Sequence, residues 1–350
     1  MNTKLVSFVI AIVLFFGQNA VFAQLLSQQE LEEQKEYTSL SEALAEPDKV
    51  IVLDLLTSDL DQLPKDIIKL KNLQVLYLYE NRLKTLPPEI GQLKNLQVLF
   101  LDENQITSLP PEIGDLQNLR TLGLHKNKLK TLPPEIGKLK KLQTLYLSEN
   151  ELTSLPEEIG QLKNLKELDL AYNKLSKLPK VIGNLKKLVD LFLAHNQISS
   201  LPSEILQLPN LKEFYLDDNR LKGIPEQGNK LGNLLNLGLA NNQLTSLPGA
   251  IGSMKKLENL YLSNNKLEKL PASIGQMKSL VFLDLSDNKL VVLPDEITQL
   301  SNLEELNLYN NRLNKLPREM VKMQSLKGLG IGQNDIQVVD LNLKEGIDIY

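Results

Sequence analysis

The 350-residue chain contains no cysteine. This absence excludes disulfide bonds, thiolate nucleophiles, and zinc or iron–sulfur sites built on cysteine. The sequence also lacks a phosphate-binding glycine loop, a His-Glu-x-x-His zinc helix and a G-x-S-x-G nucleophile turn. A net charge of −4 is too small to indicate a nucleic-acid partner. We therefore predict a protein that is not an enzyme, with no catalytic residues and no cofactor.

Long apolar runs are absent except at the N-terminus. There, Lys4 supplies a positive charge, residues 5–16 form an apolar run, and residues 20–23 (AVFA) suit a signal peptidase. The pattern predicts a signal peptide over residues 1–23 and a mature chain that is secreted, periplasmic or on the outer surface. An uncleaved membrane anchor is the alternative, because the run is shorter than a typical transmembrane helix. No other segment is apolar enough to span a membrane, so we expect none after signal removal.

The rest of the chain repeats one unit of 23 residues. Stepping by 23 from Asn81 meets an asparagine every time as far as Asn334, and Pro87 has counterparts from Pro64 to Pro317. Thirteen such units cover residues 50–348, the first and last being degenerate. The repeat therefore leaves no room for a linker or a second large domain in this part of the chain.

Each unit reads LxxLxLxxNxLxxLPxxIxxLxx. The alternation in Leu76-Tyr77-Leu78 predicts a short strand with both leucines on one side and Tyr77 on the other. One unit cannot bury its leucines alone, but stacked parallel neighbours can. Asn81 follows the strand, where its amide can satisfy backbone groups of its own unit and the adjoining one. Pro87 lies in the return segment, where no sheet hydrogen bond is lost.

These units resemble those of the leucine-rich repeat family, in its 23-residue class. The resemblance implies an α/β repeat fold, a right-handed solenoid or horseshoe. Its parallel sheet would line the concave face, and short 3-10 or extended segments would form the convex side. Residues 24–49 are expected to form a helical N-terminal cap, and residues 338–350 a C-terminal cap. At Gly228, which replaces the usual Ile, we expect local looseness on the convex side.

Function must lie in the outward strand positions, which are the second, third, fifth, seventh and eighth of each unit. Of 17 aromatic residues, 9 Tyr and 8 Phe, four fall in the signal segment, and ten of the remaining 13 occupy these positions. Strand propensity explains part of this excess. It does not explain why the rings gather on the face that has no partner within the chain, whereas a binding interface does.

Charge follows the same division. The outward positions hold 16 Asp or Glu and five Lys or Arg, a net −11, so the remaining positions sum to +7. An acidic face repels nucleic acid and favours a partner with exposed Lys or Arg. We predict that the ligand-binding residues on the concave face are Tyr77, Tyr79, Phe100, Asp102, Glu103, Tyr146, Asp169, Tyr172, Phe192, Tyr215, Asp217, Asp218, Tyr261, Asp284 and Tyr309.

Two other features have simpler explanations. His125 and His195 lie three units apart, too far to share one ion, and we predict no metal site, although either could join a metal contact with a second molecule. The glycines of Gly328-Leu329-Gly330 fill outward positions of the last strand, so they are not read as a dinucleotide loop.

These observations favour a secreted, non-catalytic protein-binding module. The uniform units and the signal peptide are similar to those of secreted leucine-rich-repeat proteins of pathogenic spirochaetes and of bacterial internalin-like proteins. That resemblance implies a host-cell surface or extracellular-matrix protein as the partner. A bacterial envelope scaffold that binds its own proteins, and a glycan-binding protein, remain alternatives at this stage.

Overall fold

The computed structural model describes residues 25–226, 231–336 and 346–350. The signal peptide predicted over residues 1–23 lies outside these residues, as do Gly228, where local looseness was expected, and residues 338–345 of the predicted C-terminal cap. Within the described residues, no helix is both long enough and apolar enough to cross a membrane.

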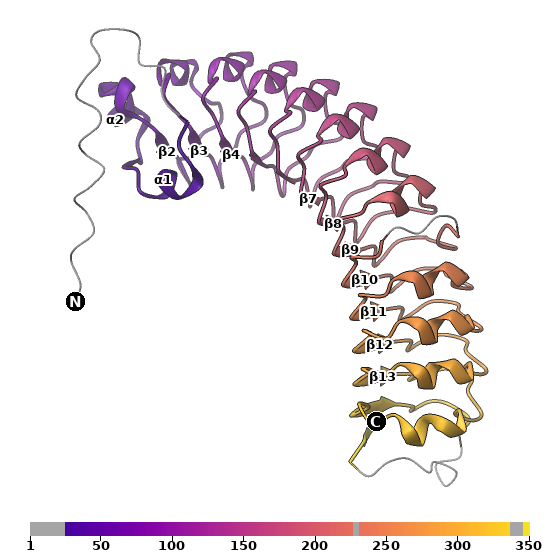
Figure 1. The fold of residues 1–350 in the computed structure, drawn as a ribbon. Helices are drawn as coiled ribbons and strands as arrows, with labels where there is room; N and C mark the ends of the chain where they lie inside the picture. The colour runs from indigo at the N-terminus through magenta and orange to yellow at the C-terminus, as the bar shows by residue number, and fades with distance from the viewer. Residues whose placement is uncertain (1–24, 227–230, 337–345) are drawn as a thin grey trace, which may run out of the picture.

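The strands form one open, parallel sheet of 15 strands whose spatial order is the sequence order. The sheet lines the inner side of an arc (Figure 1). The strands are β1 (Glu36–Tyr37), β2 (Val52–Asp54), β3 (Val75–Tyr77), β4 (Val98–Phe100), β5 (Thr121–Gly123), β6 (Thr144–Tyr146), β7 (Glu167–Asp169), β8 (Asp190–Phe192), β9 (Glu213–Tyr215), β10 (Asn236–Gly238), β11 (Asn259–Tyr261), β12 (Phe282–Asp284), β13 (Glu305–Asn307), β14 (Gly328–Gly330) and β15 (Asp348–Ile349).

The outer side of the arc is formed by five-residue 3-10 helices, one for most units (Figure 1). Nearly all begin directly after the repeat proline, which has extended backbone angles and precedes the first helical residue. They are η2 (Lys65–Lys69), η3 (Pro88–Gln92), η4 (Pro111–Asp115), η5 (Pro134–Lys138), η6 (Glu157–Gln161), η7 (Lys180–Asn184), η8 (Ser203–Gln207), η9 (Gly249–Ser253), η10 (Ala272–Gln276), η11 (Asp295–Gln299) and η12 (Arg318–Lys322).

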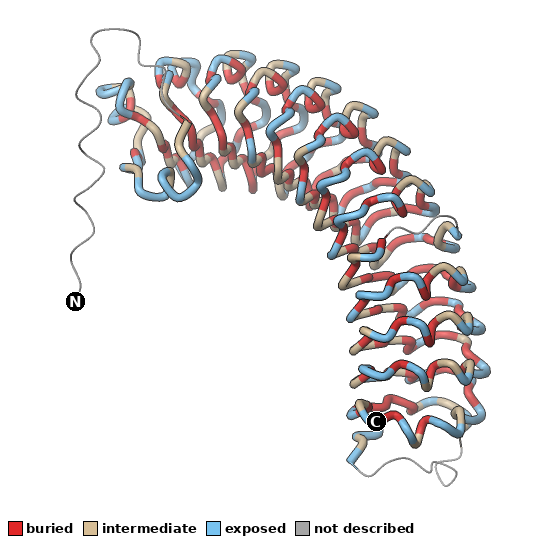
Figure 2. The backbone as a smooth tube through the Cα atoms, viewed as in Figure 1, coloured by how far each residue is buried: buried red, intermediate tan, exposed pale blue. Residues whose placement is uncertain are grey.

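The repeat leucines and isoleucines fill the space between these two layers. Leu76, Leu99, Leu122 and Leu145 are all fully buried, and so is the Ile of most 3-10 helices. Figure 2 shows buried segments of the backbone recurring from unit to unit along the arc. Each fully buried Leu stabilises the fold by about 1.5–3 kcal/mol relative to its exposed state, and only neighbouring units provide that burial. The sheet and the 3-10 return segments confirm the predicted solenoid.

The asparagine row joins each unit to the one before it. Asn104 Nδ2 donates to the carbonyls of Leu78 at 2.8 Å and Leu101 at 3.0 Å, and its Oδ1 accepts from Leu83 N at 3.0 Å. The same set of bonds recurs at Asn127 and at later members of the row. The amide therefore satisfies backbone groups in its own and the adjoining unit, as its chemistry predicted.

The two ends of the sheet contain strands that the repeat pattern did not reveal. Before the first unit, the segment that was expected to be helical contains α1 (Gln28–Glu32), α2 (Leu40–Ala45) and η1 (Pro47–Lys49), but also β1, which pairs with β2. At the other end, β15 pairs with β14, so the last residues extend the sheet. Neither two-residue strand has the Leu-x-Leu alternation that identified the others.

Candidate binding face

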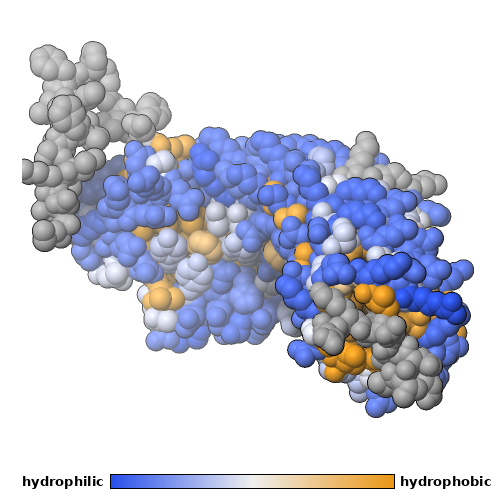
Figure 3. Space-filling model, turned by 60° about the horizontal axis from the view of Figure 1, so that its bottom comes forward, coloured by the Kyte–Doolittle hydropathy of each residue, from blue (hydrophilic) through white to orange (hydrophobic). Residues whose placement is uncertain are grey.

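The concave face of the sheet is built from the fifth residue of each unit, whose side chain points away from the leucine core. In β3, β4 and β6 these residues are Tyr77, Phe100 and Tyr146, each partly exposed, while the leucines on either side are buried. Figure 3 shows pale and orange surface on the inner side of the arc between hydrophilic flanks. The N-terminal segment borders the start of this face, where Leu26 N donates to Gln74 Oε1 at 2.9 Å and the Leu26 carbonyl accepts from Gln97 Nε2 at 2.8 Å. Farther along the arc, no other described element packs on the face (Figure 1).

Three rings gather near the N-terminal end of this face. Tyr79 stacks on Phe100 with a centroid distance of 5.0 Å, and Tyr77 lies 5.9 Å from each of them. Burial is the main cause that raises the pKa of the Tyr79 hydroxyl, and the nearby carboxylate of Asp102 adds to it. Rings held this way present a rigid apolar surface that loses little entropy on binding.

A second aromatic group lies farther along the arc. Phe192 and Tyr215 stack at 5.8 Å, and Tyr261 meets Phe282 at 5.2 Å with tilted planes. Burial, helped by the charge of Glu213, raises the pKa of Tyr215 to about 12. Phe282 is not among the predicted site residues, although its third position is one of the outward positions of the unit.

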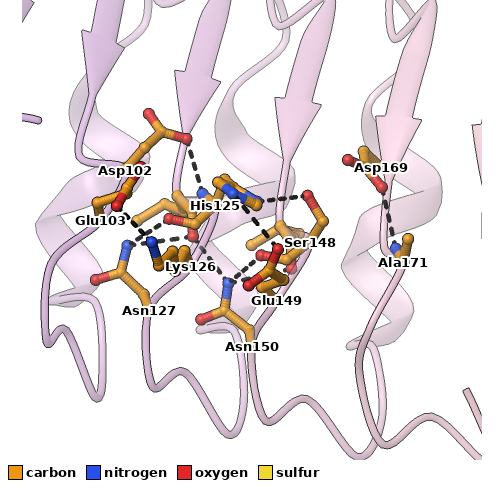
Figure 4. Close-up of polar contacts among 12 residues, drawn as sticks. Asp102, Glu103, His125, Lys126, Asn127, Ser148, Glu149, Asn150, Asp169 and Ala171 are labelled. Atoms are coloured by element: carbon orange, nitrogen blue, oxygen red, sulfur yellow. Dashed lines mark hydrogen bonds and ion pairs between the residues drawn. The ribbon is translucent and has the colours of Figure 1, made fainter. Parts of the chain in front are cut away.

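Asp102 belongs to a polar group beside β4 to β6, in which His125 is the central residue (Figure 4). Asp102 Oδ1 accepts from His125 N at 2.8 Å, and His125 Nδ1 lies 2.9 Å from Ser148 Oγ. Asp102 is only 7% exposed, and its Oδ2 has no hydrogen-bond partner among the described residues. Burial is the main cause that raises the pKa of its carboxyl. Asp102 is thus far less accessible than its outward position suggested.

Asp217 repeats this arrangement on β9. Its Oδ1 accepts from Ala240 N at 2.9 Å, and burial raises its pKa as well. Asp169 and Asp284 behave differently: each is a fifth-position residue whose Oδ1 caps the backbone N–H two residues later, in Ala171 and Ser286, at 3.0 Å. All four carboxylates are therefore held in place by the backbone rather than free to rotate.

The eighth residue of each unit, just before the asparagine, adopts a left-handed backbone conformation with φ between 51° and 58° from Glu80 to Gln333. This turn carries Glu103, which pairs with Lys126 at 2.5 Å, and Asp218, which lies 3.5 Å from His195 Nε2. Tyr172 stacks on His195 at 4.0 Å and is 53% exposed. The eighth-position side chains, most of which are polar or charged, thus form a rim along one edge of the face.

A row of acids crosses the middle of the face at the third position, which the site prediction omitted. Glu167, Asp190 and Glu213 are direct partners on β7, β8 and β9. Like charges directly opposite each other destabilise a sheet. Burial and the two neighbouring carboxylates raise the pKa of Asp190. Tyr146 approaches this row, because its hydroxyl donates to Glu167 Oε2 at 3.0 Å.

The structure divides the predicted residues into three groups. The aromatic residues and aspartates of the fifth position lie together on the concave face, while Tyr79, Asp102, Asp217 and Tyr309 occupy seventh positions beside them and Glu103, Tyr172 and Asp218 lie on the rim. His125 and His195 each have an acidic neighbour, Glu149 at 3.8 Å and Asp218 at 3.5 Å. The described residues contain no group of three or more His, Asp or Glu that could hold a metal ion.

Comparison with protein families matches residues 50–122, 110–172 and 225–338 to a leucine-rich repeat region, and residues 163–204 to a two-copy leucine-rich repeat model. A search of curated proteins finds no match.

Among solved structures, a leucine-rich-repeat protein of Leptospira interrogans is 39% identical, with 91% of this chain and 100% of that chain covered and a TM-score of 0.58. An internalin of Listeria monocytogenes has a TM-score of 0.76 at 24% identity, covering 87% of this chain and 88% of its own. The plant peptide hormone receptor RGFR1, solved with RGF2, is 29% identical over 86% of this chain and 58% of its own, with a TM-score of 0.60.

The repeat asparagines, the parallel concave sheet and these matches agree, and the chain belongs to the leucine-rich repeat family.

Proposed function

We propose that this protein is a secreted, non-catalytic binding module whose concave face holds a protein partner. The observation that carries the proposal is the row of partly exposed aromatic rings on a sheet face that other described residues border only at its N-terminal end. Rigid, partly desolvated aromatic side chains are the residues that most often anchor protein interfaces. Secretion rests on the N-terminal segment of the sequence.

Electrostatics specify the kind of partner. The outward strand positions sum to −11 while the rest of the chain is positive. Glu167, Asp190 and Glu213 have no Lys or Arg partner among the ion pairs of the described residues. A partner with exposed Lys or Arg would relieve their mutual repulsion, and the field of the face would speed its approach.

The solved relatives support the same use of the fold. One was solved as a peptide hormone receptor in complex with RGF2, and another is a bacterial internalin. We further propose, from the resemblance of the sequence to secreted bacterial leucine-rich-repeat proteins, that the partner is a host-cell surface or extracellular-matrix protein.

The experiment is a capture assay with the mature protein on extracts of host-cell surface and of bacterial envelope. The test variant replaces Tyr146, Phe192, Tyr215 and Tyr261 with Ala. The matched control replaces Val291 and Val292, which are 48% and 49% exposed and lie outside the face. We expect a host-surface protein that the control captures and the test variant does not, with weaker capture at high salt. Capture that survives the four substitutions would exclude the concave face as the binding site. Capture from the envelope extract alone would favour a bacterial scaffold. A glycan array tests the alternative that the protein binds sugars.

A further inference from the structure

The fifth positions of ten consecutive units contain one pattern twice. Along β3 to β7 and again along β8 to β12, the order is aromatic, aromatic, glycine, tyrosine, aspartate. We call β3–β7 the first module and β8–β12 the second module. The pairs of equivalent residues, each 115 apart, are Tyr77 and Phe192, Phe100 and Tyr215, Gly123 and Gly238, Tyr146 and Tyr261, and Asp169 and Asp284.

The seventh positions share part of the pattern. Asp102 corresponds to Asp217, and Ser148 to Ser263. Likeness between the modules is uneven around the unit. None of the five unit pairs is identical at the second, third, eighth, twelfth or thirteenth position, whereas three are identical at the last position, namely Asn95 and Asn210, Asn118 and Asn233, and Lys141 and Lys256. Among the outward strand positions, the likeness is confined to the fifth and seventh.

The structure gives equivalent residues equivalent contacts. Tyr77 stacks on Phe100 at 5.9 Å, and Phe192 on Tyr215 at 5.8 Å. The seventh-position aspartate of each module accepts a hydrogen bond from the next strand, at 2.8 Å from His125 N and at 2.9 Å from Ala240 N. The fifth-position aspartates cap their own strands at the same distance, 3.0 Å.

The two glycines explain why this geometry recurs. A Cβ on Gly123 would collide with the Phe100 ring and the Asp102 carboxylate, and one on Gly238 would collide with Asp217 and the Tyr215 ring. In each module, therefore, a ring and a carboxylate lean over a bare stretch of backbone. The next strand then presents a tyrosine, Tyr146 or Tyr261, on the far side of that stretch.

From this double arrangement we infer that the concave face binds two copies of one recognition element, one on each module, carried in the same direction by a single polypeptide with tandem repeats. The inference rests on the proposed function and specifies its partner.

Direction follows from the symmetry of the face. All strands are parallel, so the second module is reached from the first by continuing along the stack rather than by a two-fold rotation. A two-fold symmetric dimer presents its two copies in opposite directions and cannot match both modules in the same way. A polypeptide that repeats its own motif in line can.

Spacing follows from the sheet. Five strand spacings of about 4.8 Å separate equivalent residues by about 24 Å along the face. An extended chain advances about 3.3 Å per residue, so its motif would recur about every seven residues.

The side chains of the modules define the chemistry of the element. Their fifth and seventh positions contain aromatic residues and aspartates but no Lys or Arg. We therefore expect the recognition element of the partner to contain an aromatic residue and a neighbouring Lys. Its aromatic side chain would lie over the glycine, and its Lys would face the carboxylates and the faces of the rings.

The probes are two synthetic peptides that test this match on the full chain. The single probe is acetyl-Lys-Trp-Lys-amide. The tandem probe contains Lys-Trp-Lys twice with a period of seven residues, separated by Ser-Gly-Ser-Gly. A control tandem peptide has a period of four residues, which spans at most about 14 Å and cannot reach both modules.

NMR of tyrosine-labelled protein should show the single probe shifting the Tyr146 and Tyr261 ring signals together, at two peptides per chain. One tandem probe should bind per chain, about 100-fold more tightly than the single probe. The control peptide with a four-residue period should show no such gain in affinity. Tyr146→Ala and Tyr261→Ala should each reduce the tandem probe to the affinity of the single one. Val291→Ala, at an exposed side chain outside the concave face, should leave all affinities unchanged.

Shifts at one module only, at neither module, or no gain for the tandem probe would overturn the inference. The capture assay separates this failure from failure of the proposed function. If the four-residue Ala variant no longer captures the partner but the peptides give one of these contrary results, only the two-copy inference is wrong. If capture is also unaffected by the variant, the binding face itself is wrong.

Discussion

Asn150 and Leu124 are joined across two neighbouring units, because Asn150 Nδ2 donates to the Leu124 carbonyl at 2.8 Å. The same amide accepts from Leu129 N at 2.9 Å and donates to the Leu147 carbonyl at 3.1 Å. One buried side chain therefore satisfies backbone groups on both sides of a unit boundary, and the row of such residues holds the arc in register.

Replacing Asn150 with Ala should lower the free energy of unfolding by about 2–3 kcal/mol, because buried backbone groups are left unpaired. Asn164 provides the control. Its Nδ2 donates to the Lys140 carbonyl at 2.7 Å, but in an exposed position. Asn164→Ala should cost less than about 1 kcal/mol. Chemical unfolding followed by circular dichroism measures both, and equal losses would contradict the role assigned to the buried row.

Two glycine substitutions should differ in cost although both sites are crowded. A Cβ on Gly114, in η4, would meet the backbone carbonyl oxygen of Glu135 at 2.5 Å, whereas one on Gly123 would meet only side-chain atoms of Phe100 and Asp102, which can shift by giving up part of their own contacts. We expect Gly114→Ala to destabilise by about 3 kcal/mol and Gly123→Ala by about 1 kcal/mol. Thermal unfolding compares the two, and the reverse order would show that the concave side chains cannot move aside.

The left-handed turn before each asparagine makes a prediction at Glu80. This exposed residue has a φ of 51°, a conformation that costs a non-glycine residue about 1–2 kcal/mol. A glycine at this position removes the strain, but its more flexible unfolded chain cancels part of the resulting gain in stability. Glu80→Gly should therefore stabilise the protein by about 0.5–1 kcal/mol, and β-branched Val should destabilise it. The midpoints of urea unfolding measure the stability of both variants. A Val variant that is more stable than the native chain would contradict this prediction.

The buried carboxyl of Asp102 predicts a pH effect. Burial raises its pKa above the value in the unfolded chain, so the folded protein holds this proton more tightly. The contribution of the group to stability is complete below the unfolded pKa and is lost as pH rises through the folded pKa. Asn cannot ionise, and its Oδ1 can still accept from His125 N. Asp102→Asn should therefore gain stability relative to the native chain at pH about 7, and this gain should vanish near pH 3. A difference independent of pH would contradict it.

The repeat period made the fold predictable in unusual detail. The leucines, the asparagine row and the prolines each recur at a fixed step, so every strand from β2 to β14 could be placed from the sequence. The terminal strands β1 and β15 could not be placed, because an edge strand pairs through its backbone with a single neighbour and needs no repeat pattern.

The sequence predicted the candidate face by its outward positions but not the state of each side chain. Position alone cannot tell that Asp102 folds back over Gly123 and becomes buried, while Glu103, the next residue, turns outward through a left-handed conformation. The burial of Asp102 depends on contacts between units, which a single unit does not encode. The row Glu167–Asp190–Glu213, by contrast, recurs at the repeat step of 23 and was available from the sequence, although the predicted site did not include it.

The most direct test of the concave-face account is the dissociation constant of the captured partner, measured by calorimetry against three forms of the protein. Truncating four anchoring rings, at Tyr146, Phe192, Tyr215 and Tyr261, should weaken binding at least about 100-fold, because such anchors commonly contribute more than 1 kcal/mol each. The Val291→Ala, Val292→Ala control should bind like the native chain. The loss of real anchors would change the dissociation constant far more than twofold. If the folded four-residue variant keeps the native dissociation constant within about twofold, the concave face is not the binding site.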